Sequence, residues 1–225
     1  MPDTHALGIL GGTFDPIHFG HLRLAQEVAD ALSLSEVRFI PGGTPPHRAA
    51  PHSSAQHRVA MVRLAIEDNP LFVLDERETR RDGPSYTFDT LAALRAELGA
   101  AQPLVLIMGA DAFTAFNRWH RWRDIFALAH IAVAHRPGAA LMQINDTALQ
   151  QAFLQRRTDN GEAVHRAPAG CVIEVPITAL DISATAIRGL LQARRSARYL
   201  MPPAVLEYIE HNYLFLRGNF DNAAG

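Results

Sequence analysis

Gly11-Gly12-Thr13-Phe14-Asp15-Pro16-Ile17-His18-Phe19-Gly20-His21-Leu22 is the stretch of sequence that decides the fold. The apolar run before it, Ala6-Leu7-Gly8-Ile9-Leu10, predicts a strand buried on both faces. The two glycines are expected to let the backbone turn, and Asp15-Pro16 is typical of a turn or a helix start. From about Gly20 onward, apolar residues recur at helical spacing. The stretch therefore predicts a strand, a sharp turn and the first turn of a helix.

Two histidines, His18 and His21, lie where the strand is expected to lead into the helix. Three residues apart, they can share one face if this turn is already helical. A helix N-terminus presents free N–H groups and about half a positive charge, so it favours anions. The pair therefore indicates phosphate chemistry, and the alternative is a helix-capping turn with exposed histidines. The stretch contains neither the dinucleotide fingerprint nor a phosphate loop ending in Gly-Lys-Ser/Thr.

Short apolar runs that predict strands recur between segments of helical periodicity. After the first strand they span 36–41, 71–75, 103–109, 131–135 and 171–175. The periodicity also predicts a helix near 119–128, whereas the polar run from 157 to 169 is expected to be loop. This alternation predicts an α/β fold: a doubly wound, mostly parallel, Rossmann-like sheet with helices on both faces. Ligands bind such sheets beyond the carboxyl ends of the strands.

Composition excludes several classes of protein. The chain has 225 residues, enough for one sizeable domain, and a formal net charge of −2, so no general attraction to nucleic acid or anionic membranes is expected. No apolar stretch approaches the roughly 20 residues that span a bilayer, and no secretory signal is visible, so the expected location is the cytoplasm. The single cysteine excludes an intrachain disulfide framework.

The chain contains no lysine, because all 21 residues of its Lys+Arg count are arginine. Phosphate must therefore be bound by arginine, histidine, a metal ion or the N–H groups of a helix. A Schiff-base lysine is impossible.

In its strand–turn–helix context, the twelve-residue stretch resembles the hallmark of the nucleotidyltransferase superfamily, (His/Thr)-x-Gly-His after the first strand. Its fuller form, Gly-Gly-Thr-Phe-Asp-Pro-x-His-x-Gly-His-Leu, is similar to that of the nicotinate-nucleotide adenylyltransferase family. A second motif, Ile182-Ser183-Ala184-Thr185-Ala186-Ile187-Arg188, resembles the family's Ile-Ser-x-Thr-x-Ile-Arg. The resemblance runs from Leu7 to about Tyr213. It implies one nucleotidyltransferase domain over 1–225, whose C-terminal helical part, about 183–215, closes the ATP site.

The resemblance implies that ATP binds between the two motifs. Its implied contacts are Gly11, Gly12, Thr13, Phe14, His18, Gly20, His21, Gly109, Asp111, Ile182, Ser183, Thr185 and Arg188. Among these, His18, His21 and Arg188 are expected to be catalytic, and the histidines would donate hydrogen bonds to phosphate oxygens as charge develops. Mg²⁺ is expected to arrive on the ATP phosphates with few protein ligands, and no separate metal site is expected.

The family likeness also implies a second pocket, for nicotinate mononucleotide. Its implied residues are Asp15, His47, Arg48, Thr87, Trp119, His120 and Arg136. Trp119 would stack on the pyridine ring, and Arg48 and Arg136 would bind the phosphate. The backbone N–H of His120 would meet the nicotinate carboxylate, and such a donor would match a carboxamide poorly.

The reaction implied is in-line attack of the mononucleotide phosphate on the α-phosphorus of ATP, without a covalent enzyme intermediate. It would give nicotinate adenine dinucleotide and pyrophosphate. Two alternatives stay open: transfer to nicotinamide mononucleotide or another phosphorylated acceptor, and a non-catalytic dinucleotide-binding or metal-sensing module using Asp15, His18 and His21. The sequence does not decide whether the protein forms a homo-oligomer.

Overall fold

The computed structural model describes residues 5–43, 50–136, 144–178 and 180–216. Within these ranges, six strands form one sheet in the order β3-β2-β1-β4-β5-β6, and each neighbouring pair is parallel. The strands are β1 (Leu7–Gly12), β2 (Glu36–Pro41), β3 (Phe72–Leu74), β4 (Leu104–Gly109), β5 (His130–His135) and β6 (Val172–Pro176). The predicted doubly wound sheet is confirmed, so the carboxyl ends of all six strands meet at one edge.

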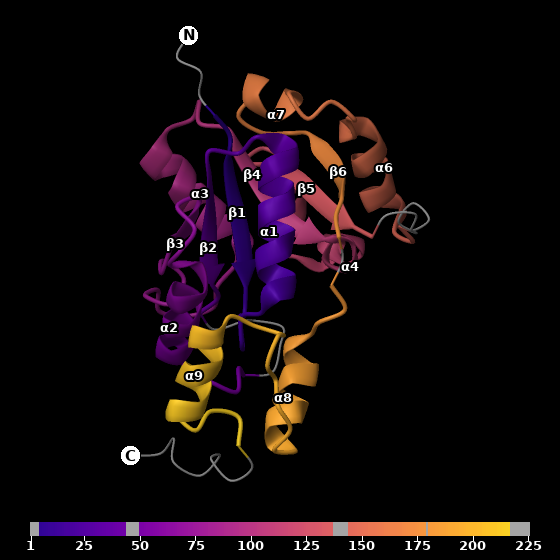
Figure 1. Ribbon diagram of the computed structural model, residues 1–225. Helices are drawn as coiled ribbons and strands as arrows, with labels where there is room; N and C mark the ends of the chain where they lie inside the picture. The colour runs from indigo at the N-terminus through magenta and orange to yellow at the C-terminus, as the bar shows by residue number, and fades with distance from the viewer. Residues whose placement is uncertain (1–4, 44–49, 137–143, 179, 217–225) are drawn as a thin grey trace.

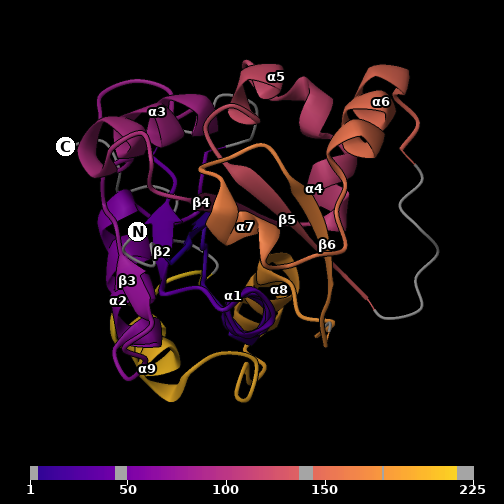
Figure 2. The same cartoon turned by 90° about the horizontal axis from the view of Figure 1, so that it is seen from above.

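Helices cover both faces of the sheet. The first face carries α1 (Phe19–Leu32), α2 (Ala55–Ile66), α7 (Ala163–Arg166), α8 (Ala184–Gln192) and α9 (Pro203–His211). The second carries α3 (Thr87–Leu98), α4 (Ala110–Thr114), the 3₁₀ turn η1 (Phe116–Arg118), α5 (Trp122–Ile125) and α6 (Thr147–Arg156). Figure 1 shows α8 and α9 at the end of the molecule where β1 finishes, and in Figure 2 α3, α5 and α6 lie across the strands from α1, α2 and α9.

The centre of the sheet explains the apolar runs in the sequence. The side chains of β4 from Leu104 to Met108 are all buried, because this strand contacts a helix layer on each face. Each such side chain contributes about 1.5–3 kcal/mol by leaving water. β1 lies between β2 and β4, where the strand order reverses. A ligand crevice is therefore expected beyond the ends of β1 and β4.

Two local predictions were wrong. The helix expected over 119–128 is helical only in α5, because Arg121, just before it, takes a left-handed conformation with φ 53°, and the aromatic cluster around Phe116 fixes the path. The polar run expected to be loop contains the short helix α7, which the fully buried side chain of Val164 anchors. Tertiary packing outweighs local pattern in both places.

Candidate active site

The chain leaves β1 through the left-handed residue Phe14 and then turns at Asp15-Pro16, as the sequence predicts. Gly11 and Gly12 close β1 as its last two residues, and the left-handed conformation falls on Phe14, with φ 51°. The expectation that the two glycines make the turn is therefore wrong. A Cβ at Gly12 would lie 2.8 Å from the Phe14 ring, so this glycine makes room for the buried aromatic side chain. Phe14 in turn meets His21 edge-on, with 5.1 Å between ring centroids.

His18 and His21 lie together at the start of α1. Their rings are stacked with 3.8 Å between centroids, which confirms that the two side chains share one face. The backbone N–H of His18 donates to Nδ1 of His21 over 3.3 Å, and the N–H of His21 donates to the carbonyl of His18 over 2.9 Å. Because Nδ1 of His21 accepts a hydrogen bond, the neutral ring carries its proton on Nε2.

Both histidines are neutral near pH 7. Burial lowers the pKa of His18 to about 4. Burial, followed by the charge of His18, lowers the pKa of His21 to about 3. Among the described residues, Nδ1 of His18 is buried without a hydrogen-bond partner. The pair therefore offers phosphate uncharged ring donors, and the negative charge of a bound triphosphate would raise both pKa values.

Gly20 is the residue that lets His18 keep its position. A Cβ at Gly20 would lie 2.9 Å from Nδ1 of His18 and 3.6 Å from the carbonyl oxygen of Ile182. Any larger residue would push the imidazole away, so the small residue of the motif has a steric cause. The same distances show that the start of α1 lies against the segment that precedes α8.

The second motif begins α8 and is bonded to the first. Ser183 is the N-cap and accepts the N–H of Ala186 over 3.1 Å. Arg188 donates to the Thr185 hydroxyl over 3.2 Å and to the backbone carbonyl of Asp15 over 2.6 Å. The two motifs that the sequence singles out therefore meet in space, and Arg188 connects them.

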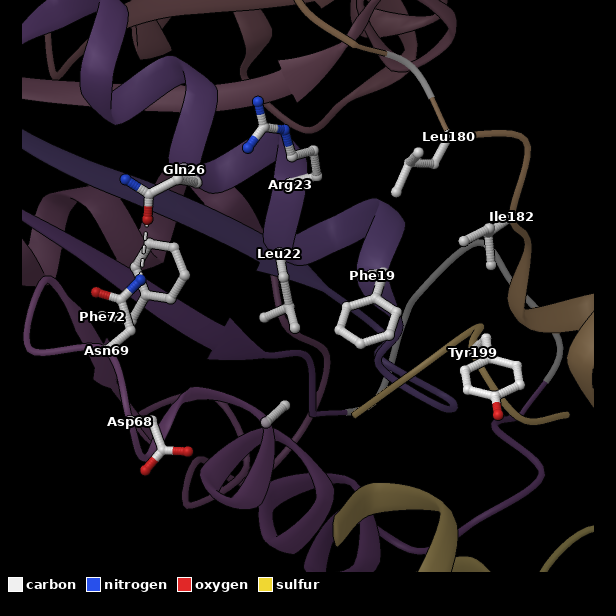
Figure 3. Close-up of a pocket in the computed structure, with 11 residues that line it drawn as sticks. Phe19, Leu22, Arg23, Gln26, Asp68, Asn69, Phe72, Leu180, Ile182 and Tyr199 are labelled. Carbon is white, nitrogen blue, oxygen red and sulfur yellow. Dashed lines mark hydrogen bonds between the residues drawn. The ribbon is translucent and has the colours of Figure 1, made fainter. Parts of the chain in front are cut away.

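An open hollow of about 540 Å³ lies along the outer side of α1 (Figure 3). Phe19 and Ile182, one from each motif, both line it, while His18, His21 and Arg188 do not. Its other lining residues are Leu22, Arg23, Gln26, Ala65, Asp68, Asn69, Phe72, Leu180 and Tyr199. The hollow thus lies at the junction of the two motifs without including their polar side chains.

The end of β4 provides the adjoining part of the edge. Gly109 is the N-cap of α4, and a Cβ there would have no atom within 4 Å, so the space above it is open. Asp111 lies in the first turn of α4 with an exposed side chain. Since β4 pairs with β1, these two predicted ATP contacts lie at the carboxyl end of the strand next to β1, at Gly109 and in the first turn of the helix that follows.

The residues predicted for the pyridine ring come together from two elements. Thr87 is the first residue of α3, directly after its N-cap, Tyr86. The Tyr86 ring lies 4.5 Å from that of His120, centroid to centroid. Trp119 is half-buried and packs edge-on against Phe116 at 5.3 Å. The structure therefore brings Thr87 close to the Trp119-His120 pair.

Three other predicted residues of the mononucleotide pocket, of which Arg48 and Arg136 are predicted to bind its phosphate, differ in their surroundings. Arg136 follows β5 with its side chain 66% exposed, and its guanidinium is 3.5 Å from the Asp181 carboxylate, just ahead of the second motif. His47 and Arg48 lie outside the described residues. Contact between Arg136 and a nucleotide stays a prediction.

Asp15 is buried and ties two loops together. Its carboxylate accepts the backbone N–H of His52 over 2.7 Å and the hydroxyl of Ser53 over 2.5 Å. Both oxygens are therefore engaged by the segment that leads into α2. Direct contact of this carboxylate with the mononucleotide stays a prediction.

Sequence reasoning missed Arg58. This residue of α2 is 2% exposed, and its guanidinium donates to the backbone carbonyls of Thr13, Gly42 and Gly43. A signal was present, because Arg58 precedes the buried Met61 and Val62 by three and four residues. An arginine at that spacing belongs to the buried stripe of a helix and needs internal acceptors.

No group of three or more His, Cys, Asp and Glu side chains within the described ranges is arranged to hold a metal ion. Over the same part of the chain, none of the helices is long and apolar enough to cross a membrane.

Comparison with known proteins finds a family model and relatives that match most of the chain. Residues 9–190 match the cytidylyltransferase-like family. The chain is 52% identical over 214 residues to a "Probable nicotinate-nucleotide adenylyltransferase" of Dechloromonas aromatica, covering 94% of this chain and 98% of the relative. It is 46% identical to a protein of the same name from Acidithiobacillus ferrooxidans, covering 93% and 95%.

Among solved structures, the fold is similar to that of the Plasmodium falciparum nicotinic acid mononucleotide adenylyltransferase complexed with NaAD. The TM-score is 0.71 at 16% identity, over 94% of this chain and 97% of that one. At this identity the likeness concerns the fold alone.

Proposed function

The chain belongs to the cytidylyltransferase-like family and, within it, to the nicotinate-nucleotide adenylyltransferases, and from this we propose that it transfers the adenylyl group of ATP to nicotinate mononucleotide. A phosphate oxygen of the mononucleotide attacks the α-phosphorus of ATP, and the bond from that phosphorus to the bridging oxygen breaks. The products are nicotinate adenine dinucleotide and pyrophosphate. The observation that carries the proposal is the bond from Arg188 to the Asp15 carbonyl, which joins the two phosphate-type motifs at one edge of the sheet.

The ATP side of the site supports catalysis by hydrogen bonding and position. Nε2 of His21 is the free donor of a neutral ring, and the N-terminus of α1 adds partial positive charge beside it. We assign both histidines to the phosphate oxygens, where charge develops in the transition state. The attacking phosphate monoester is ionised near pH 7, since its second pKa is about 6, so no general base is required.

The acceptor side supports selection of the acid. The first turn of α3 and the Trp119-His120 pair lie together, with Tyr86 and His120 in ring contact. We infer that the indole of Trp119 stacks on the pyridine ring while the His120 N–H binds the carboxylate. A carboxamide would bring its own N–H₂ donors against that N–H, which makes it the poorer acceptor.

We also propose that Mg²⁺ enters with ATP. The described residues near the turn offer neutral imidazoles and the exposed Asp111 carboxylate, a donor set too small to hold the ion alone. The phosphate oxygens and water must supply its other ligands, with Asp111 as a candidate protein ligand. When bound, the ion neutralises charge on the triphosphate. Because both substrates are phosphorylated metabolites of the cell interior, we place the reaction in the cytoplasm.

One assay tests the proposed function and its alternatives. The protein is mixed with ATP, Mg²⁺ and one acceptor at a time: nicotinate mononucleotide, nicotinamide mononucleotide or phosphopantetheine. Pyrophosphate release and the new dinucleotide are both measured. We expect fastest turnover with nicotinate mononucleotide. Faster turnover with either of the others would reassign the acceptor, and nucleotide binding without pyrophosphate release would favour the non-catalytic module.

A further inference from the structure

Arg58 connects the loops that follow two neighbouring strands. Its Nη1 donates to the carbonyl of Thr13, in the turn after β1, over 2.9 Å. The same atom donates to the carbonyl of Gly42, just after β2, over 2.6 Å, and Nη2 donates to that of Gly43 over 3.3 Å. One planar guanidinium therefore fixes the distance between the two loops at their bases.

The loop after β2 is held at the same place by other bonds. The N–H of Gly42 donates to the carbonyl of Gly12 over 2.8 Å, which joins the ends of β1 and β2. A Cβ at Gly43 would lie 2.4 Å from the carbonyl oxygen of Glu78 and 2.7 Å from the Ser85 hydroxyl. Glu78 and Ser85 therefore leave no room for a side chain at Gly43, while the carbonyl of Gly43 accepts the hydrogen bond from Arg58.

The buried charge of Arg58 has acidic neighbours. Burial lowers the pKa of its guanidinium, and the negative charges of Asp15 and Glu78 act in the opposite direction. Asp15 is the residue that binds both Ser53 and, through its carbonyl, Arg188. The turn after β1 is therefore held from the α2 side by Arg58 and from the α8 side by Arg188.

A second arginine also bonds to several backbone carbonyls, but it lies away from the proposed site. Arg95 of α3 donates to the carbonyls of Leu128, Ala100, Gln102 and Pro168. These acceptors precede β4, β5 and β6, so they lie at the amino ends of the strands, opposite the proposed site. Arg95 can stabilise the fold but has no substrate loop to position.

We infer that Arg58 is a positioning residue that sets the distance between the ATP loop at Thr13 and the loop after β2 at Gly42 and Gly43. The inference rests on the proposed function and on the sequence prediction that Arg48, which follows β2, binds the mononucleotide phosphate, so that the two phosphates must meet in line from neighbouring loops. We expect each loop to keep its own contacts with nucleotide when Arg58 is replaced. Lysine keeps the positive charge, but its single ammonium does not span three carbonyls, so we expect the two loops to shift relative to one another despite the bond that joins the ends of β1 and β2.

The test compares Arg58→Lys with Arg95→Lys in two-substrate kinetics, thermal unfolding and hydrogen exchange. We expect Arg58→Lys to lower kcat by about 100-fold, with both KM values within about threefold of wild type, because misplacement of about 1 Å costs that much. Exchange should rise in peptides covering residues 12–13 and 42–43. Arg95→Lys should lower the unfolding midpoint and leave kcat unchanged.

Wild-type turnover in the same assay tests the proposed function separately, since that protein keeps Arg58. If Arg58→Lys is unstable, Arg58→Ala is assayed instead, with guanidinium added to the solution. Its kcat should rise at least tenfold with guanidinium but not with methylammonium. The inference is overturned if a folded Arg58→Lys retains kcat within about threefold, if its whole loss lies in one KM, or if guanidinium restores nothing.

Discussion

Nδ1 of His21 accepts the backbone N–H of His18, which leaves only Nε2 to meet a bound nucleotide. The stacked ring of His18 and the edge of Phe14 fix the plane of this imidazole. A donor held in place before substrate arrives needs no reorganisation when charge develops on phosphate. At the scale of single residues, the site therefore works through the orientation of neutral groups.

Replacement of His21 by alanine removes that oriented donor. We expect His21→Ala to lower kcat by about 100- to 1000-fold, the usual effect of losing one such donor, with a small change in the unfolding midpoint. Steady-state kinetics and a thermal melt measure the two effects. His211→Ala, an exposed histidine of α9, is the matched control and should change neither. Normal turnover in His21→Ala would remove this residue from the mechanism.

Trp119 and Trp122 are three residues apart but have different surroundings. Trp122 is buried in the aromatic cluster, whereas Trp119 is only half-buried and packs on one edge. We expect Trp119→Ala to raise KM for nicotinate mononucleotide about tenfold and to leave KM for ATP unchanged. Trp122→Phe should lower stability without changing either KM. A raised KM for ATP in Trp119→Ala would show that the pocket assignment is wrong.

At the scale of elements, the first turn of α1 places the two histidines of the motif at the N-terminus of a helix. The sequence predicts this helix, its start and the shared face of the two histidines. It cannot show that the left-handed residue after β1 is Phe14 rather than Gly11 or Gly12, because the cause is burial of the Phe14 ring over Gly12. Local pattern thus places the element, while packing of a single side chain sets the exact path of the backbone.

Two glycines in helices provide a sharp comparison at this scale. Gly20 lies in α1 with the His18 ring 2.9 Å from a Cβ, whereas Gly189 lies in α8 with no atom within 4 Å. Glycine to alanine in an open helix adds about 1 kcal/mol of stability, so Gly189→Ala should raise the unfolding midpoint and keep kcat. Gly20→Ala should lower kcat at least tenfold by displacing His18. Equal kcat in both variants, measured beside urea unfolding, would refute the steric role of Gly20.

At the scale of the whole molecule, the sequence predicts six parallel strands and the meeting of the two motifs. Both follow from the alternation of apolar runs and from the rule that strand ends share an edge. The contacts of Arg58 are not predictable in this way, since its acceptors are backbone carbonyls more than ten residues away. The short helix α7 is missed for a similar reason, because burial of Val164 overrides a polar local sequence.

The buried histidine pair makes stability depend on pH. The folded pKa values, about 4 for His18 and about 3 for His21, lie below the ordinary value of 6.5. The unfolded chain therefore binds more protons between about pH 6.5 and 3, and stability is lost as pH falls through this window. Between pH 7 and 4, we expect wild type to lose about 6 kcal/mol more unfolding free energy than the double variant His18→Asn/His21→Asn, about 3 kcal/mol for each histidine. Parallel urea-unfolding profiles for the two proteins would contradict this assignment.

The central claim is direct in-line transfer from ATP to a phosphate held by the neighbouring loops. ATP carrying sulfur at the α-phosphorus in one known configuration tests it most directly, with nicotinate mononucleotide as acceptor. The account predicts a thio-substituted nicotinate adenine dinucleotide whose α-phosphorus configuration is inverted, because a single displacement inverts that centre. Retained configuration would require a covalent enzyme intermediate. That result, or the absence of any dinucleotide, would contradict the account.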